Sequence, residues 1–427
     1  MANMSKKTAL LLITAFVTFS LYSQVNKQLQ NTFLEAEYFL MNEDYSDAIN
    51  YYLQIYSELP DNANIAFSIG VCYLNIPGKK DISVKYLEAA VKNMSAKHKE
   101  GTLNQVSAPY DALYELARAY RINYNFDKAK EIYLKYRETL MPDDQENIEF
   151  IDHEIKVCDI AKTLINKPIT FSAENMGELF NDEKPNFNPV ISADGKSFAF
   201  MSTLKFYDAI MYTRMLNGKW AGPVNIYPEL QIDGDLNISC LSKEGKLLLL
   251  SKDDNFDSDI YSSVFDGTIW SPAIKLNKNI NTRYWEAHAF VSEDGNMLIF
   301  SSDRPGGLGG LDLYVSRKIN GEWGPAINLG PDINTRFNED RPFLTNNDKI
   351  IIFSSQGHEN MGGYDLFRSE QLPEGKWKKP ENLGYPLNTP DDDTYYMPVG
   401  DGRSGYNFLD KNGEGFGKED IYRIILK

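Results

Sequence analysis

Two different spacings of apolar residues divide the chain. From Lys27 to about Asn166, apolar positions recur at intervals of three and four, which predicts amphipathic helices. From Pro168 to Lys427, apolar and polar positions alternate, and Gly, Asn and Asp interrupt them at short intervals, which predicts strands joined by tight turns. The pattern therefore predicts a helical segment, residues 27–166, followed by an all-β segment, residues 168–427.

The helical segment repeats a pair of helices. "NEDYSDAINYYLQIYSELP" (42–60) and "NYNFDKAKEIYLKYRETLMP" (123–142) each place an aromatic residue, then Ala48 or Ala129, then a closing proline. A less regular copy between them has Ser83 or Val84 where the alanine is expected, and residues 143–164 predict one capping helix. The phrases resemble tetratricopeptide repeats, which implies three stacked helical hairpins with a cap. A generic helical bundle is the alternative.

The β segment repeats a longer phrase. Trp220, Trp270, Trp323 and Trp377 follow one another at intervals of 50, 53 and 54 residues and open the phrases "WAGPVNI", "WSPAIKL", "WGPAINL" and "WKKPENL". A hairpin phrase such as "SEDGNMLIFSS" and a third strand such as "DLYVSR" precede each tryptophan. In the first copy, "YDAIMYTR", the aspartate comes early, which predicts an altered hairpin in that unit.

The last copy predicts how the repeats close. It begins at "YYMPVGDGRSGYNFL" and has no tryptophan phrase, but residues 167–186, "KPITFSAENMGELFNDEKPN", align with the missing strand. We therefore predict a five-bladed β-propeller over residues 168–427, whose first strand completes the last blade. The pattern resembles the WD40-like repeats of exported bacterial propellers, including the TolB type.

The order of the two segments carries a further resemblance. Tetratricopeptide-like helices followed by such a propeller resemble the N-terminal part of an OmpA-like family of envelope proteins in bacteria with type IX secretion and gliding. The resemblance implies a non-enzymatic periplasmic scaffold that binds envelope or outer-membrane proteins. In those relatives a peptidoglycan-binding domain follows the propeller. No such segment follows Lys427 here, so peptidoglycan binding is not expected from this chain.

The first residues predict export. Lys6 and Lys7 precede an apolar run from Ala9 to Leu21, and small residues follow it, as in a signal peptide over residues 1–23. The run is shorter than the ~20 apolar residues of a membrane-spanning helix. An uncleaved anchor is the alternative. We expect a soluble periplasmic protein without direct membrane insertion after cleavage, associated with the outer membrane through its partners.

Charge and cysteine content exclude several classes of function. The formal net charge is −16, from 60 acidic and 44 basic residues, which argues against nucleic acid as a partner. Cys72, Cys158 and Cys240 are widely spaced and form no metal-binding or disulfide motif, so we expect them in the core.

Catalytic and metal motifs are weak. The chain contains no nucleophile elbow and no phosphate-binding loop, so we expect no enzyme activity and no cofactor. Two acidic loops, beginning at Asp253 and Asp410, have the alternating oxygen ligands of calcium loops but coincide with ordinary turns of the repeat. We therefore favour turns over metal sites. A glycan- or peptide-binding propeller, including a hydrolase, is the alternative function.

Two sets of residues are candidates for binding. Arginines, acids and one tryptophan recur in "NTRYWEAH" and "NTRFNEDRP", which connect blades and are expected at one mouth of the channel: Arg283, Trp285, Glu286, Arg336, Glu339 and Arg341. The alternative is that these arginines and acids pair with each other and lock the ring. Four tyrosines are expected in the groove of the helical repeats, or between its helices: Tyr38, Tyr45, Tyr114 and Tyr124.

Overall fold

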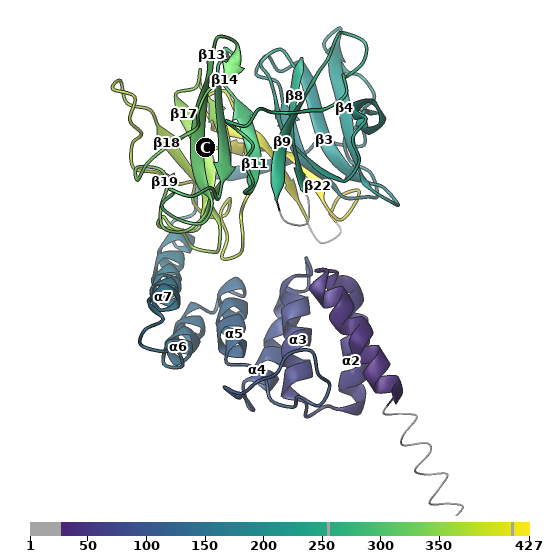
Figure 1. The fold of residues 1–427 in the computed structure, drawn as a ribbon, viewed down its shortest axis with the longest axis vertical. Helices are drawn as coiled ribbons and strands as arrows, with labels where there is room; N and C mark the ends of the chain where they lie inside the picture. The colour runs from purple at the N-terminus through teal and green to yellow at the C-terminus, as the bar shows by residue number, and fades with distance from the viewer. Residues whose placement is uncertain (1–26, 254–256, 411–413) are drawn as a thin grey trace, which may run out of the picture. The chain divides into compact units, whose positions relative to one another are not determined.

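The structure, a computed structural model, describes residues 27–253, 257–410 and 414–427. The chain forms two compact units that divide between Cys158 and Asp159, inside the long helix α7 (Gln145–Ile165). The first unit is helical and the second is a five-bladed β-propeller, so the predicted fold class is confirmed (Figure 1). The predicted signal peptide, residues 1–23, lies outside the described residues.

Three pairs of helices and one further helix make up the helical unit. The pairs are a helix over residues 27–41 with α2 (Tyr45–Glu58), α3 (Ala63–Leu74) with α4 (Ser83–Ala90), and α5 (Asp111–Ile122) with α6 (Phe126–Arg137). A short 3-10 helix, η1 (Lys80–Ile82), precedes α4, and α7 follows the third pair. The predicted helix pairs are present, whereas their assignment as tetratricopeptide repeats stays a prediction.

Apolar faces and small residues pack these helices. Helix α2 buries one face, on which Ala48, Tyr52 and Ile55 recur at intervals of four and three. A Cβ added at Gly70 in α3 would lie 2.4 Å from Cγ of Leu87 in α4. The close approach of α3 and α4 therefore depends on the glycine.

A buried ion pair joins the last three helices. Arg121 of α5 lies 3.4 Å from the Glu154 carboxylate of α7, and both side chains are almost fully buried. The Tyr133 hydroxyl of α6 donates to the same carboxylate at 2.8 Å. Removing one partner from a buried pair typically destabilises a protein by ~3–5 kcal/mol, so Glu154 fixes α5, α6 and α7 together.

The propeller consists of five antiparallel sheets, each of which is one blade. Figure 1 shows β17, β18 and β19 of blade 4 side by side. Blade 1 contains β2 (Asn186–Ile191), β3 (Ser197–Thr203), β4 (Asp208–Leu216), β5 (Lys219–Trp220) and β6 (Val224–Asn225). Blade 2 contains β7 (Asp235–Leu241), β8 (Leu247–Asp253), β9 (Ser258–Val264) and β10 (Ile274–Lys275). Blade 3 contains β11 (Glu286–Val291), β12 (Met297–Ser302), β13 (Asp312–Ile319), β14 (Glu322–Trp323) and β15 (Ile327–Asn328). Blade 4 contains β16 (Glu339–Thr345), β17 (Ile350–Ser355), β18 (Asp365–Glu370) and β19 (Glu381–Asn382).

The fifth blade is built from both ends of the propeller unit. Its strands β20 (Met397–Val399), β21 (Ser404–Leu409) and β22 (Asp420–Leu426) are completed by β1 (Phe171–Asn175). Strand β1 pairs antiparallel with β22, from Phe171 opposite Leu426 to Asn175 opposite Tyr422. The predicted ring closure is confirmed, because residues 167–186 supply the strand that the last repeat lacks.

Buried asparagines attach the connectors of blades 2, 3, 4 and 5 to their blades. The Asn334 side chain accepts from the Leu313 backbone N–H at 2.8 Å and donates to the Leu313 carbonyl at 2.9 Å. One amide side chain thus extends the backbone pairing of β13. The same two bonds recur in three other blades, between Asn281 and Ile260, Asn388 and Leu366, and Asn181 and Ile421.

The repeated aspartate holds the glycine turn. Asp312, the first residue of β13, accepts hydrogen bonds from the backbone N–H groups of Leu308 and Gly309 and from the Asn328 side chain. In blade 5 Asp420 makes the same contacts with Phe416, Gly417 and Asn175. The aspartate thus joins the glycine-containing turn before it to an asparagine of the strand paired with its own.

The repeated tryptophans fill the core. Trp323 and Trp377 are buried in the largest apolar cluster, and Trp270 is buried in a second one. Trp220 of blade 1 is half-buried, with its ring 6.0 Å from Phe180 and packed edge-on. The tryptophan of the repeat is thus a core residue in three blades and only half-buried in blade 1.

Blade 1 departs from the repeat where the sequence predicts it. Four residues, 204–207, join β3 to β4, whereas nine residues, 303–311, join β12 to β13. Ala209 takes the ladder position that Asp312 holds in blade 3, and it is buried, whereas Asp208 is exposed. The altered hairpin is therefore confirmed, and it leaves blade 1 without the buried aspartate.

Candidate functional site

The channel of the propeller has two ends of different construction. Each inner strand runs from a connector between blades to the hairpin that joins the first and second strands of its own blade. We call the end formed by connectors, such as residues 277–285 and 330–338, the connector end. The hairpin end is formed by turns such as residues 292–296 and 345–349.

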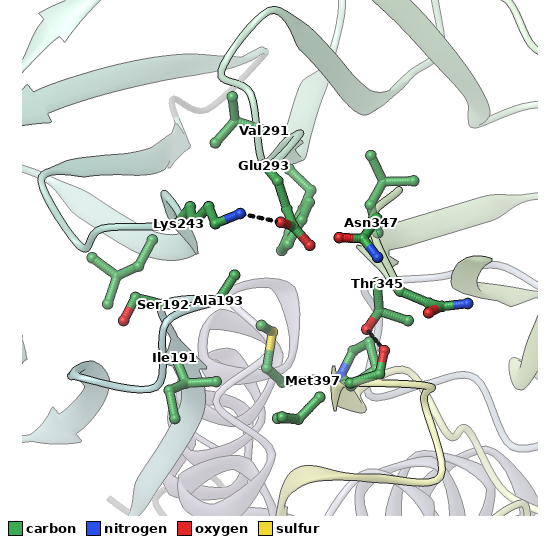
Figure 2. A pocket seen from close by; sticks show the side chains of 16 residues that line it. Ile191, Ser192, Ala193, Lys243, Val291, Glu293, Thr345, Asn347 and Met397 are labelled. Carbon is green, nitrogen blue, oxygen red and sulfur yellow. Dashed lines mark hydrogen bonds and ion pairs between the residues drawn. The ribbon is translucent and has the colours of Figure 1, made fainter. Parts of the chain in front are cut away.

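The hairpin end contains a cavity of about 240 Å³ to which all five blades contribute (Figure 2). Its inner wall is apolar and buried, and consists of Ile191, Leu241, Phe290, Val291, Leu344 and Met397. Polar side chains surround this wall. An apolar wall with a few polar groups at its edge is the usual composition of a binding pocket.

An ion pair crosses the edge of this cavity. Lys243 of blade 2 lies 2.6 Å from the Glu293 carboxylate of blade 3, as Figure 2 shows. The hydrogen bond and the charge of Glu293 raise the pKa of Lys243. The Glu293 backbone N–H donates at 3.2 Å to the Asp348 carboxylate of blade 4. Contacts between neighbouring hairpins therefore position the charged groups of the edge.

The blade 4 hairpin has an unusual backbone. Asn346, Asn347 and Asp348 have φ angles of 53°, 53° and 61°, whereas the blade 3 hairpin places only Gly295 in this left-handed region. Side chains disfavour that region, although Asn and Asp tolerate it best. The exposed amides of Asn346 and Asn347 line the cavity. They are candidate contacts, because the repeat elsewhere forms this hairpin without them.

A buried polar cluster lies between blades 3 and 4. His288 Nδ1 lies 2.8 Å from Asp340 Oδ1, and the Ser301 hydroxyl donates to the same oxygen at 2.6 Å. Burial alone would raise the pKa of Asp340, but the charge and hydrogen bond of His288 outweigh it and hold that pKa low. The serine donates to the aspartate rather than to the histidine, so the cluster lacks the order of a Ser-His-Asp triad. It ties β11 and β12 to β16.

Three of the residues predicted for a binding mouth lie at the connector end. Arg283 is exposed and donates to the Tyr284 hydroxyl at 2.9 Å, while Arg336 is exposed above the Phe337 ring. Trp285 is half-buried, and its backbone N–H donates to Asp303. The connector end thus carries arginine and aromatic side chains, as expected.

The two predicted glutamates are not surface groups, which corrects the sequence-based expectation. Glu286 and Glu339 are both fully buried. Glu286 accepts hydrogen bonds from the backbone N–H and hydroxyl of Thr282 and from Ser302, and Arg304 lies 3.1 Å from it. The contacts of both glutamates lie within their own blade and connector, and the arginine beside Glu286 is Arg304 rather than one of the predicted arginines.

Arg341 also departs from the expectation of a channel mouth. It lies inside the channel with φ 48°, and its guanidinium is 5.5 Å from the centre of the Tyr395 ring. With His288 and Ser239 it lines a space of only about 10 Å³, the size of one water molecule. Arg341 is therefore a residue of the propeller interior.

The four predicted tyrosines of the helical unit do not form one set. Tyr38 and Tyr124 are exposed, by 62% and 47%, and Tyr45 is half-buried. Tyr114 packs against the rings of Tyr133, Tyr136 and Phe150, and burial raises its pKa. Tyr114 is half-buried and packs between the helices, which is the alternative stated for these tyrosines.

The residues at the edge of the cavity were missed by sequence reasoning. Lys243, Glu293 and Asn346 occupy the second position of three equivalent hairpin phrases, "SKEG", "SEDG" and "TNND". The residue at this position differs from copy to copy, although each phrase joins the first two strands of its blade. Variation at one position of an otherwise regular repeat was the available signal.

The described residues contain neither a metal-binding cluster nor a membrane-spanning helix. Among residues 27–253, 257–410 and 414–427, no group of three or more His, Cys, Asp or Glu side chains is arranged to hold a metal ion. The two acidic loops considered for calcium include residues outside these ranges. None of the helices in the described part of the chain is long and apolar enough to cross a membrane.

Comparison with known proteins gives likenesses of fold only. No protein-family model matches the sequence, and no curated protein matches it. Among solved structures, TolB from Acinetobacter baumannii aligns at a TM-score of 0.37 with 18% identity, over 57% of this chain and 54% of its own length. This chain therefore spans about half of that TolB structure.

Sugar-cleaving enzymes align to a similar degree. The α-L-arabinofuranosidase PaAbf62A from Podospora anserina, solved with cellotriose, has a TM-score of 0.38 and 10% identity over 61% of this chain and 97% of its own. A thermostable family-43 glycoside hydrolase has a TM-score of 0.39 and 14% identity over 59% of this chain and 92% of its own. Likeness at this level carries no argument about function, and the five blades stand on the sheet topology of the chain itself.

Proposed function

We propose that this chain is a non-enzymatic scaffold of the cell envelope that binds other envelope proteins through the hairpin end of its propeller. The proposal includes an exported, periplasmic location and association with the outer membrane through partners. The resemblance of the repeats to envelope proteins of type IX secretion and gliding indicates the kind of cell in which to test it.

The composition of the hairpin end is the observation that carries the proposal. A buried apolar wall from five blades is surrounded by the Lys243–Glu293 ion pair and two asparagine amides. Protein interfaces combine an apolar centre with a polar rim in this way. The cavity, about 240 Å³, is smaller than the ~300–1,000 Å³ of typical ligand pockets, so it fits one side chain of a partner better than a glycan.

The arrangement of the acids supports a role without catalysis. Glycoside hydrolysis requires two carboxylates that face each other across an open site. Glu293 is the one carboxylate among the described residues that line the cavity, and Lys243 neutralises it. Glu286 and Glu339 are buried in contacts with their own connectors. A propeller that binds a peptide or glycan ligand remains the second candidate, favoured by the existence of the cavity.

Site-specific photo-crosslinking in envelope fractions of the native cell tests the proposal. A photoreactive residue replaces Asn347 at the hairpin end, Arg336 at the connector end or Tyr38 in the helical unit. We expect defined envelope proteins to crosslink at Asn347 more strongly than at the other two positions. Ala193→Trp, which fills the cavity edge, should abolish this crosslink, whereas Val224→Trp on the outer strand of the same blade should not.

Two results would count against the proposal. Equal crosslinking at the three positions would show that the hairpin end is not the docking face. Absence of any protein crosslink, together with binding of a small glycan or peptide that Ala193→Trp blocks, would favour the second candidate.

A further inference from the structure

A second surface lies at the connector end, where blade 1 departs from the repeat in two places. The short hairpin 204–207 is one, and the 3-10 helix η2 (Tyr227–Leu230) in the connector to blade 2 is the other. The two departures meet, because the rings of Tyr207 and Tyr227 lie 4.9 Å apart. The Asn225 side chain also donates to the Tyr207 hydroxyl at 2.9 Å.

This surface exposes aromatic side chains that do not help to hold the propeller together. Phe206 is 85% exposed and Tyr207 is 40% exposed. In blades 3, 4 and 5 the equivalent hairpin instead packs on a connector. A Cβ added at Gly309, Gly362 or Gly417 would lie 2.0, 2.1 or 2.5 Å from a connector carbonyl. Phe206 has no such structural role, so its exposure calls for another explanation.

Carboxylates surround these rings. Asp208 follows Tyr207 directly and is exposed, as are Asp233 and Asp235. The Tyr227 hydroxyl donates to the Gly234 carbonyl at 2.9 Å, which places the two aspartates beside that ring. Burial and the charges of Asp233 and Asp235 raise the pKa of Tyr227, consistent with this proximity.

A cation already lies on the most exposed ring. Lys205 Nζ is 5.1 Å from the centre of the Phe206 ring, within the distance at which a cation is attracted to an aromatic face. Lys252, whose side chain lies beside Gly234, is a second cation near this surface. The acids Asp208, Asp233 and Asp235 outnumber these two lysines, and the chain as a whole carries a net charge of −16.

We propose that the blade 1 surface, formed by Phe206, Tyr207, Tyr227, Asp208, Asp233 and Asp235, binds a basic segment of a partner protein. An arginine or lysine side chain of that segment stacks on the aromatic rings, displaces Lys205 and pairs with the aspartates. The inference rests on the proposed scaffold function, and it adds a second docking face with a defined partner chemistry.

The test places a photoreactive phenylalanine analogue at Phe206 in the full chain and identifies the crosslinked peptides from envelope fractions. We expect peptides rich in Lys and Arg. Asp233→Asn with Asp235→Asn should reduce the yield at least several-fold, as should raising the salt from 0.15 to 0.5 M. The same analogue at Ile327, a residue of blade 3 that is 66% exposed, is the control.

The outcomes separate this inference from the scaffold proposal. Acidic or uncharged peptides, a second copy of this chain, or a yield no higher than at Ile327 would each overturn it. Crosslinking at Asn347 without crosslinking at Phe206 would leave the scaffold proposal standing and remove only the blade 1 surface. The salt dependence of the yield at position 206 keeps the test valid if the double aspartate variant fails to fold.

Discussion

Blades 3 and 4 each contain a buried glutamate at the same position of the repeat, but the two glutamates have different partners. Glu286 and Glu339 each accept hydrogen bonds from a connector threonine and from the serine that ends the second strand. In blade 3 the Arg304 guanidinium completes the set, 3.1 Å from Glu286. In blade 4 the corresponding space is occupied by His358, and no cation among the described residues pairs with Glu339.

The contacts of the two basic residues establish that they correspond. Arg304 donates to the Ile280 carbonyl and lies 5.0 and 5.1 Å from the Phe300 and Tyr314 rings. His358 Nε2 lies 2.8 Å from the Ile333 carbonyl, and its ring is 5.9 and 5.2 Å from the Phe353 and Phe367 rings. The histidine therefore replaces the guanidinium in packing but not in charge.

This comparison shows that the repeat can bury its glutamate either beside an arginine or without a cation. In blade 3 the carboxylate lies beside the Arg304 guanidinium. Burial without a cation raises the pKa of Glu339 to about 7, despite the hydrogen bonds of Thr335 and Ser355. Burial also lowers the pKa of His358. Blade 4 thus contains a glutamate and a histidine whose pKa values burial shifts in opposite directions.

Removing the arginine is the strongest way to break the comparison. Arg304→Ala leaves Glu286 as a buried anion without a partner, so the free energy of unfolding should fall by ~3–5 kcal/mol. All five tryptophans lie in the propeller, so urea unfolding followed by tryptophan fluorescence measures this directly. His358→Ala, which loses a neutral hydrogen bond and ring contacts, should cost less. An equal or larger cost for His358→Ala would contradict the comparison.

The tryptophans test whether the two blades are otherwise equivalent. Trp323→Ala and Trp377→Ala each remove a buried ring from the same apolar cluster and should lower the free energy of unfolding by ~3–5 kcal/mol. The half-buried Trp220 is the control, and Trp220→Ala should cost less. A cost below ~1 kcal/mol for Trp323→Ala would show that this side chain does not support the core.

The pH dependence of stability sharpens the comparison. Glu339 has a pKa of about 7 when folded against an ordinary value of 4.5, so the folded state binds the extra proton and loses stability as pH rises through this range. The loss reaches at most on the order of 3 kcal/mol above pH 7. Glu339→Gln keeps the shape without the charge and should flatten the profile between pH 5 and 8. Glu286→Gln, the matched variant in blade 3, should leave the slope of the pH profile unchanged and lower the free energy of unfolding at both pH 5 and pH 8.

Histidine 358 gives the smallest effect and the opposite sign. Its pKa is lower in the folded state than in the unfolded state, so stability falls as pH drops below about 6.5, where the unfolded chain gains the proton. His358→Gln retains a donor for the Ile333 carbonyl and should change stability by less than ~1 kcal/mol at pH 7. It should remove part of the acid loss measured by the same unfolding experiment at pH 5. If His358→Gln loses as much stability at pH 5 as the unmodified protein, other groups cause the loss.

Much of the fold could be predicted because it depends on periodicity. The tryptophan interval, the hairpin phrases and the match of residues 167–186 to the missing strand together predict five blades and their closure. The early aspartate of "YDAIMYTR" predicts the altered hairpin of blade 1. Each of these is a regularity, or a break in one, within a single sequence.

The roles of individual charged residues could not be predicted in the same way. Arg304 stands two residues after its serine and His358 three residues after its own, so alignment of the repeats does not pair them. Their correspondence is visible only in the folded chain, where Arg304 contacts the Ile280 carbonyl and His358 contacts the equivalent Ile333 carbonyl. Glu286 and Glu339 look like surface acids in the sequence, because the hydroxyl and amide donors that allow their burial are backbone and side-chain groups of the connectors.

Hydrogen exchange of two equivalent amides tests most directly the claim that the buried carboxylates of Glu286 and Glu339 hold the connectors of the propeller. The backbone N–H groups of Thr282 and Thr335 each donate at 2.7 Å to the carboxylate of Glu286 or Glu339. Both are measured in one sample at pH 5 and pH 8, so the ratio of their protection cancels the intrinsic effect of pH on exchange. We predict that protection of Thr335 falls relative to Thr282 as pH rises, and that Glu339→Gln removes the change. A constant ratio in the unmodified protein would contradict the account.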